Sequence, residues 1–170
     1  MRLEVVIAAL GSTGTAPSHQ SGVYVWADGR AADADVLYIG EAADLKQRLT
    51  REESWTRNFM TRRHEGEHLW NSAGCGLEAV LARYPTRQPH TWPLSHHHRK
   101  QVQTALIRLA ALAGATPPGQ GAGWDYGKGK TLHDAEVTEL LTRWFADEDF
   151  VGLTERAVAT APAADNTGRS

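Results

Sequence analysis

The chain of 170 residues has a formal net charge of −2 and an apolar content of 41%, which fit one globular domain with a small appendage. No apolar run reaches the roughly 20 residues that a membrane-spanning helix needs, so no membrane partner is expected. Cys75 is the single cysteine, which excludes a disulfide framework and a cysteine-based zinc site, and a cytoplasmic location is expected.

The first part of the chain predicts three short strands. Residues 3–9 are apolar and rich in β-branched side chains, and they predict a strand rather than a signal peptide. Residues 22–26 and 36–40 have the same character, and the turn signal Asp28-Gly29 lies between them. These two strands are expected to pair as an antiparallel hairpin.

Helix-forming residues follow the hairpin. Leu45 and Leu49 are spaced to share one helical face, which predicts a helix over residues 42–49. Ser54 is a candidate N-cap for a separate helix that extends roughly to His64.

The apolar run 77–84 is compatible with a helix or a strand. Gly76 and Pro85 bracket it, and its short length favours the third strand of the sheet. Residues 85–93 are then expected to form a loop.

The last part of the chain predicts two helices. Ser95 is the expected cap of one helix, and Thr131 opens the other. The expected organisation is an N-terminal strand and loop (1–20), a central domain (21–115), a Gly-rich loop with a C-terminal helix (116–153), and a flexible tail (154–170). The expected fold class is α+β, with a small three-stranded antiparallel sheet flanked by helices, an extra N-terminal strand and a C-terminal helix.

Two tyrosines and an arginine form the main candidate site. Tyr24 and Tyr38 stand in the two strands of the hairpin, and Arg48 follows on the next helix. Gly22 and Gly40 beside the tyrosines allow another backbone or a ligand to approach closely. Hydrolysis of a phosphodiester needs a base for the attacking water and a cation near the phosphate. A tyrosine can relay a proton, and an arginine can bind phosphate oxygens with two donors.

The order of these residues resembles the GIY-YIG nuclease family across residues 22–49. Residues 22–24 (Gly-Val-Tyr) match the first motif with valine in the middle position, and residues 38–40 (Tyr-Ile-Gly) match the second. Leu45 and Arg48 match the family's leucine and arginine. The resemblance implies a compact α+β domain and hydrolysis of nucleic-acid phosphodiesters, with DNA as the expected substrate and Mg²⁺ or Mn²⁺ as the cofactor.

The resemblance also implies individual roles. Tyr24 is the expected base, whereas Tyr38 and Arg48 support the phosphate. Some family members add a histidine after the arginine, for which His64 is the best candidate and His68 the next.

Basic residues cluster in two groups, near residues 46–63 and near residues 87–100. Such groups either contact a nucleic-acid backbone or form a solvated face. The candidate nucleic-acid contacts are Lys46, Arg51, Arg62, Arg63, Arg99 and Lys100.

One residue departs from the family pattern. The family has a metal-binding glutamate in a segment like Glu-x-x-Leu-Ile, and residues 103–107 here are Gln-Thr-Ala-Leu-Ile. The amide of Gln103 is a poorer ligand for a hard divalent cation than a carboxylate. Three interpretations remain open: a catalytically weak or inactive nucleic-acid-binding member, another carboxylate from Glu78 or Asp125, or deliberate inactivation.

A second motif suggests a different class of enzyme. Residues 64–68 (His-Glu-Gly-Glu-His) fit H-E-x-x-H, in which His64 and His68 would bind zinc in a metalloprotease. Gly66 disfavours the helix that this motif needs by about 1 kcal/mol, and the flanking residues are polar. The zinc protease is therefore the lesser alternative.

Overall fold

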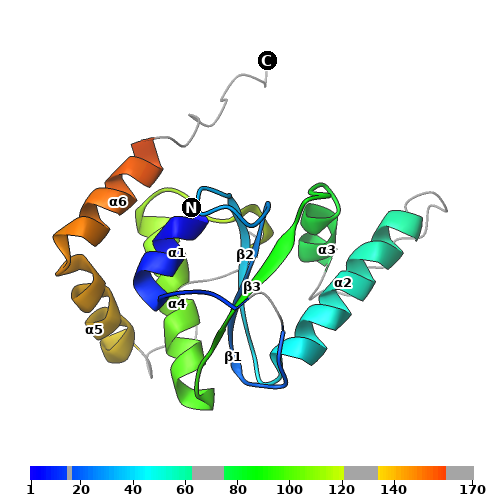
Figure 1. Ribbon diagram of the computed structural model, residues 1–170, viewed down its shortest axis with the longest axis horizontal. Helices are drawn as coiled ribbons and strands as arrows, with labels where there is room; N and C mark the ends of the chain where they lie inside the picture. The colour runs from blue at the N-terminus through cyan, green and yellow to red at the C-terminus, as the bar shows by residue number, and fades with distance from the viewer. Residues whose placement is uncertain (15–16, 63–74, 121–133, 160–170) are drawn as a thin grey trace.

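A three-stranded antiparallel sheet lies between two groups of helices in this computed structural model (Figure 1). The structure describes residues 1–14, 17–62, 75–120 and 134–159. The strands are β1 (Gly22–Ala27), β2 (Val36–Ala42) and β3 (Gln88–Pro93), in the order β2-β1-β3. The fold is therefore α+β, with helices on both faces of the sheet.

β1 is the central strand and is antiparallel to both neighbours. All six of its residues are buried, because both of its faces are covered by helices. Tyr24 pairs with Gly40, and Trp26 pairs with Tyr38. The register shifts beyond Trp26, which leaves Leu37 as an extra residue on β2. The predicted hairpin is confirmed.

One face of the sheet is covered by α2 (Leu45–Arg62) and α3 (Cys75–Leu81). The other face is covered by α1 (Leu3–Leu10) and α4 (His96–Leu112), with α5 (Asp134–Phe145) and α6 (Glu148–Ala159) packed outside them. A short 3₁₀ helix, η1 (Pro118–Gln120), contacts β2 and α3.

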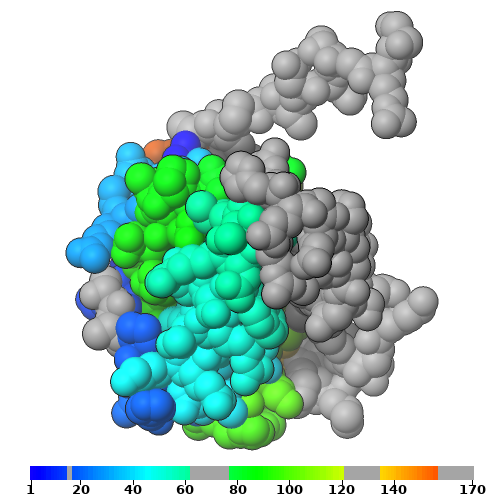
Figure 2. All heavy atoms as spheres, turned by 90° about the vertical axis from the view of Figure 1, so that its right-hand side faces the viewer, coloured from blue at the N-terminus to red at the C-terminus, as the bar shows by residue number. Residues whose placement is uncertain are grey.

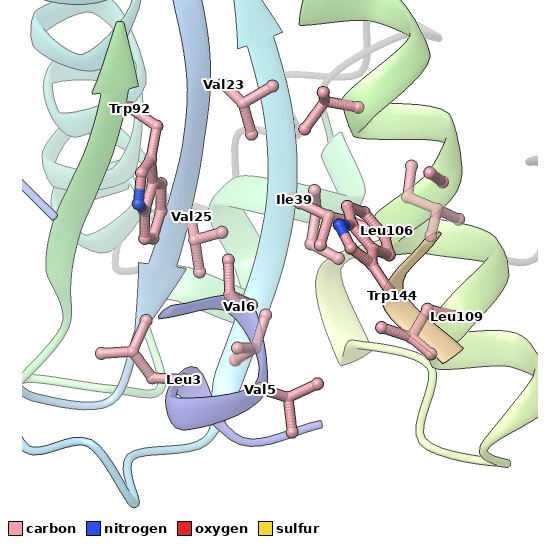
Figure 3. Close-up of a cluster of buried hydrophobic side chains, with 14 of the residues drawn as sticks. Leu3, Val5, Val6, Val23, Val25, Ile39, Trp92, Leu106, Leu109 and Trp144 are labelled. Carbon is pink, nitrogen blue, oxygen red and sulfur yellow. The ribbon is translucent and has the colours of Figure 1, made fainter. Parts of the chain in front are cut away.

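The larger apolar core fills the space between the sheet and α4. Val25 and Ile39 from the sheet meet Leu106 and Leu109 from α4, and Trp144 of α5 closes the cluster (Figure 3). These side chains are at least nine-tenths buried. Burial on this scale is the main stabilising contribution of the fold.

The N-terminal segment is a helix, and the predicted strand over residues 3–9 is wrong. Leu3, Val5 and Val6 are buried in the larger core, and Gly11, at a φ of 84°, ends the helix with its N–H bonded to the carbonyl of Ile7. A short apolar run is ambiguous between helix and strand, and tertiary packing decides between them.

The predicted third strand over residues 77–84 is wrong. Residues 75–81 form helix α3, whereas β3 lies in the expected loop. His90 and Trp92 are buried where β3 pairs with β1. Pro89 and Pro93 suggested a loop, but proline is tolerated on an edge strand.

The helices predicted over residues 42–49 and from Ser54 roughly to His64 are one helix in the described residues, α2, which continues through Ser54. At the C-terminal end, the predicted single helix is instead the pair α5 and α6. Asp147 caps the N-terminus of α6, because its Oδ1 accepts the backbone N–H groups of Asp149 and Phe150 at 2.9 and 3.3 Å. Across the residues that the structure describes, we find no helix with the length and apolar character needed to cross a membrane.

Candidate active site at the tyrosine–arginine cluster

The hairpin places Tyr24 and Tyr38 on the face of the sheet that α2 covers. Tyr24 lies opposite Gly40 in the strand register, and Tyr38 lies opposite Trp26. The two phenol rings are 6.0 Å apart between centroids and tilted by 47°. Tyr24 is fully buried, whereas Tyr38 is half-buried.

Both motif glycines are explained by close packing. A Cβ on Gly40 would lie 2.2 Å from Cζ of Tyr24 and 2.4 Å from its hydroxyl oxygen. A Cβ on Gly22 would lie 2.3 Å from the carbonyl oxygen of Trp92 and 2.9 Å from Cδ1 of Leu45. Glycine at these two positions therefore lets the phenol of Tyr24 lie across β2 and lets α2 and β3 approach β1.

Arg48 reaches the tyrosines from the second turn of α2. Its Nε donates to the hydroxyl oxygen of Tyr24 at 3.2 Å and to Oε1 of Glu52 at 2.8 Å. The side chain is 38% exposed, so one part of the guanidinium touches the buried cluster while the rest faces solvent. The predicted grouping of Tyr24, Tyr38 and Arg48 is present in the structure.

Glu52 is the centre of the cluster and was missed by the sequence analysis. It is 1% exposed. Its Oε1 accepts the hydroxyl of Tyr24 at 2.5 Å, and its Oε2 accepts the indole N–H of Trp26 at 2.8 Å. With the bond from Arg48, three donors from β1 and α2 satisfy this one carboxylate, as a buried charge requires.

Helical spacing contained the signal for Glu52. Leu45, Leu49, Glu52 and Thr56 recur at intervals of four, three and four residues, and each is at most 3% exposed. This spacing marks one face of a helix. A single helix continued through residues 45–56 would have placed Glu52 on its apolar face, one turn after Arg48.

The cluster shifts the pKa values of its members. Burial raises the pKa of Tyr24 well above its usual value of 10.0, and the charge of Glu52 raises it further. Burial also raises the pKa of Tyr38, again with a contribution from Glu52. Burial alone would lower the pKa of Arg48, but its contacts with Tyr24 and Glu52 outweigh this effect and raise the pKa. At neutral pH the cluster holds two neutral phenols and a charged guanidinium.

A second buried carboxylate, Glu78 of α3, lies close enough for its charge to interact with Glu52 and Arg48. It is 8% exposed, and within the described residues its Oε2 has no hydrogen-bond partner. Burial raises the pKa of Glu78, and the charge of Glu52 adds to this increase. α3 packs against both α2 and β2, which accounts for this placement.

Gln103 lies on α4, on the opposite side of the sheet, and its hydrogen bond reaches the backbone of β2. Its Nε2 donates to the carbonyl oxygen of Ile39 at 3.4 Å. Gln120 of η1 binds the same residue from the edge, accepting its N–H at 3.1 Å and donating to its carbonyl at 3.2 Å. Gln103 is thus connected to the cluster through the strand between Tyr38 and Gly40.

Several predicted residues lie outside the described part of the chain. They are Arg63, His64, His68 and Asp125, and the side chain of Arg62 is also not described. Among the described residues, no group of three or more His, Cys, Asp or Glu side chains is arranged to hold a metal ion. The zinc-protease motif at residues 64–68 therefore stays a prediction.

Arg99 is not an exposed cation. It is 4% exposed, and its guanidinium pairs with the carboxylate of Glu41 and donates to Nδ1 of His96 at 2.6 Å. Its polar groups tie the start of α4 to β2. That Arg99 contacts nucleic acid stays a prediction.

Three other predicted contacts are exposed. Lys46 and Arg51 lie on α2, which forms much of the face seen in Figure 2, and Lys100 lies near the start of α4. The guanidinium of Arg51 lies 5.9 Å from the ring centroid of Trp55, which is 39% exposed. An open cleft of about 550 Å³ includes Lys46, Arg51 and Trp55 in its lining.

A larger open cleft, of about 750 Å³, lies between α2 and the start of β3. Glu53 in its wall pairs with Arg87 at 2.9 Å and with Arg57 at 3.2 Å, so these two cations are already neutralised. Neither of the two clefts is lined by the phenols of Tyr24 and Tyr38. Comparisons of the chain with protein-family models, with curated proteins and with solved structures found no match.

Proposed function

We propose that this chain is a GIY-YIG-type endonuclease that hydrolyses phosphodiester bonds of DNA. The observation that carries the proposal is the contact among Tyr24, Arg48 and Glu52, whose polar atoms lie 2.5 to 3.2 Å apart at a hairpin and its following helix. Tyr38 stands beside them. A phenol, a guanidinium and a carboxylate in contact can move a proton and stabilise charge on a phosphate.

Arg48 is the group proposed to bind the phosphate. Its hydrogen bonds to Tyr24 and Glu52 come from Nε. The side chain is 38% exposed, and its remaining N–H groups are the donors proposed to bind two phosphate oxygens. The buried Glu52 holds this guanidinium in place, so little side-chain freedom is lost when the phosphate binds.

Tyr24 and Glu52 are proposed to act together as the base. The raised pKa of Tyr24 means that its phenolate is scarcely populated at neutral pH. Its hydroxyl already donates to Oε1 of Glu52 at 2.5 Å. In the proposed step, the attacking water gives a proton to the oxygen of Tyr24 while the hydroxyl proton of Tyr24 passes to Glu52. The oxygen of this water forms the new bond to phosphorus while the phosphate ester bond breaks, and the leaving oxygen keeps the electron pair of that bond and takes a proton from solvent.

This step needs a rearrangement, because Tyr24 is fully buried. Water can reach the phenol only if substrate binding opens the packing over it. We therefore propose that binding of DNA exposes Tyr24, with Tyr38 and Arg48 as the groups that meet the substrate first.

The family's metal position does not fit a divalent cation in this chain. Gln103 is neutral, and its Nε2 hydrogen bonds to the backbone of β2. A hard cation such as Mg²⁺ prefers carboxylate oxygens. No step of the proposed reaction is therefore assigned to a metal at Gln103.

A second candidate function is binding of nucleic acid without cleavage. The complete burial of Tyr24 and the neutral amide of Gln103 favour it. In this case Arg48 and the exposed cations of α2 would bind phosphates, and the phenols would have a packing role.

A plasmid-nicking assay separates the two functions. Supercoiled DNA is incubated with Mg²⁺ or Mn²⁺ and with the unaltered chain, Tyr24→Phe, Arg48→Ala or Gln103→Glu. Under the endonuclease proposal the unaltered chain nicks DNA, and Tyr24→Phe lowers the rate by about 100-fold or more. Tyr84→Phe is the matched control, since Tyr84 is a partly buried tyrosine that packs against the apolar cluster on the same face of the sheet.

The alternative outcomes are distinct. If no variant nicks DNA but fluorescence anisotropy shows binding that Arg48→Ala weakens, the binding-only function is supported and the endonuclease is rejected. If the chain neither nicks nor binds DNA, both candidates are rejected.

A further inference from the structure

Trp55 of α2 differs from the other tryptophans that the structure describes. It is 39% exposed, whereas Trp26, Trp92 and Trp144 are at most 8% exposed. The indole is a large, flat apolar group that contributes most to stability when it is buried. A lone exposed aromatic side chain is common on protein surfaces, and the surroundings of Trp55 distinguish it from such a case.

Trp55 stands in the wall of the open cleft of about 550 Å³, which α2 lines along much of its exposed side (Figure 2). Gln47, Arg51 and Trp55 follow one another at intervals of four residues, so they share one face of the helix. The guanidinium carbon of Arg51 lies 5.9 Å from the centroid of the Trp55 ring. A second row in the same wall has the same spacing and consists of Lys46, Thr50 and Ser54.

The cleft has an excess of positive charge beside the indole. Within the described residues, the ion pairs of α2 involve other arginines, and neither Lys46 nor Arg51 pairs with a carboxylate. The carboxylate in the lining belongs to Asp44, which accepts the backbone N–H of Gln47 at 2.8 Å and hydrogen bonds to Nδ1 of His19 at 2.8 Å. Asp44 is thus engaged at the start of α2, and the two cations are available for an anion.

We propose that this cleft binds a single-stranded segment of nucleic acid, with a base stacked on Trp55 and the neighbouring phosphates on Lys46 and Arg51. Proteins that bind single strands combine cations that follow the backbone with aromatic rings on which the bases stack. The guanidinium beside the indole adds a cation–π contribution. A base-paired duplex offers only its phosphates to this surface, because its bases are stacked on one another.

The cleft continues towards the proposed active site. Arg48 precedes Arg51 by three residues, so the two side chains are neighbours on the surface of α2. A strand that lies on Trp55 and Arg51 and follows the helix would bring a phosphate to Arg48. The expected substrate is then DNA with an unpaired nucleotide next to the scissile phosphate, and this statement rests on the proposed function, whereas binding of the strand does not.

The test compares two single strands that carry equal charge. Fluorescein-labelled oligothymidylate of about ten nucleotides and an abasic strand of the same length are titrated with the full chain in EDTA, and fluorescence anisotropy gives the affinities. The unaltered chain should bind oligothymidylate about tenfold more tightly than the abasic strand. Trp55→Ala should remove this preference by weakening oligothymidylate binding about tenfold, and Trp55→Phe, which keeps an aromatic face, should retain most of it.

Two further variants separate stacking from charge and from loss of apolar surface. Arg51→Ala should weaken binding of both strands and reduce the slope of log affinity against log salt concentration by about 0.7. Met60→Ala is the matched control, because Met60 is an apolar side chain of α2 that is 46% exposed and does not line the cleft. It should bind both strands like the unaltered chain. Thermal unfolding of each variant shows whether it is folded.

Three results would overturn the proposal. They are equal affinity of the unaltered chain for the two strands, oligothymidylate binding that Trp55→Ala leaves unchanged, and no binding of either strand. Displacement of oligothymidylate by polyglutamate as effectively as by unlabelled oligothymidylate would also count against it, since the cleft would then select an acidic polymer rather than bases.

These outcomes can be told apart from those of the nicking assay. A chain that prefers oligothymidylate through Trp55 but nicks no DNA keeps this binding site and rejects the endonuclease. A chain that nicks DNA but binds oligothymidylate and the abasic strand alike keeps the endonuclease and rejects this site.

Discussion

The two faces of the sheet bury different chemistry. Towards α4, β1 and β2 present Val23, Val25 and Ile39, which meet aliphatic and aromatic side chains (Figure 3). Towards α2, the same strands present Tyr24 and Tyr38, and Glu52 and Arg48 of the helix contact Tyr24. The alternation of side chains along a strand makes such a division possible.

The difference bears on function because a buried charge loses its hydration, so a buried ion pair adds little net stability to a fold. An apolar contact of similar volume is often as stabilising as a buried ion pair or more so. The face towards α4 is mainly apolar, with the ion pair between Arg99 and Glu41 at the start of α4, whereas the centre of the α2 face buries the carboxylate of Glu52. Strongly perturbed pKa values are typical of functional sites, and Tyr24, whose pKa is raised well above its usual value, lies on the α2 face.

The largest loss of stability is expected from a substitution in the apolar core between the sheet and α4. Leu106 is fully buried between α4 and the sheet. Leu106→Ala should lower the free energy of unfolding by about 2–5 kcal/mol, because it removes buried methyl groups and leaves a cavity. Denaturant unfolding measures the change. Leu112→Ala, at a position 73% exposed, is the control and should cost less than about 0.5 kcal/mol; equal losses for both would contradict the assignment of the core.

The second effect disturbs the polar face by adding one methyl group. In Gly40→Ala the new Cβ would lie 2.2 Å from Cζ of Tyr24, so the phenol or the strand must shift. Overpacking of this kind costs about 1–3 kcal/mol and should also impair any activity of the cluster. Chemical denaturation and the nicking assay provide the measurements.

Gly152→Ala in α6 is the matched control for this substitution. Its new Cβ would meet the flexible end of Arg156 at 3.3 Å. Replacing a helical glycine by alanine there should leave stability unchanged or raise it by about 0.5–1 kcal/mol. A Gly40→Ala variant as stable as this control would show that Tyr24 does not lie over Gly40.

The third prediction concerns the pH dependence of stability that Tyr24 gives to the α2 face. The pKa of Tyr24 is raised above 10.0 in the folded state by burial and by Glu52. Its stabilising contribution is therefore complete below pH 10 and is lost as the pH rises through the folded-state pKa, because the unfolded chain ionises first. The free energy of unfolding should fall by up to about 1.4 kcal/mol per pH unit from this group above pH 10.

Tyr24→Phe should remove the part of this pH dependence of stability that Tyr24 contributes. Unfolding by urea at several alkaline pH values gives the comparison, with Tyr84→Phe as the control that keeps the slope. Tyr38 also has a raised pKa, so part of the slope should persist in Tyr24→Phe. An unchanged slope in Tyr24→Phe would mean that its phenol is not the buried, protonated group described above.

The sequence predicted the hairpin and three of the four clustered residues, because their signals are local. β-Branched and aromatic residues around Asp28-Gly29 indicate paired strands, and the spacing from Tyr24 through Tyr38 to Arg48 is carried by that hairpin and the next helix. Glu52 was missed because a charged helical residue is usually exposed. Its burial depends on which face of α2 meets the sheet.

The misassigned elements have a different cause. Residues 3–9 have the composition of a strand, and β3 contains two prolines, which indicated a loop. Tertiary contacts override both tendencies: α1 packs against α6 and the larger core, and β3 completes the sheet beside β1. These contacts join segments far apart in the chain, which short-range patterns do not register.

The smallest expected effect concerns the exposed cations of α2, on the outer side of the polar face. Lys46 and Arg51 line one open cleft, and both are exposed. If DNA crosses this face, Lys46→Ala should weaken DNA binding by less than about tenfold, and it should reduce the slope of log affinity against log salt concentration by about 0.9. Arg143→Ala on α5 is the control, since Arg143 is an exposed cation on the apolar side of the sheet and pairs with Glu139. Fluorescence anisotropy at several salt concentrations measures both quantities. A change in slope for Arg143→Ala and none for Lys46→Ala would place the DNA on the other side of the molecule and separate it from Tyr24, Arg48 and Glu52.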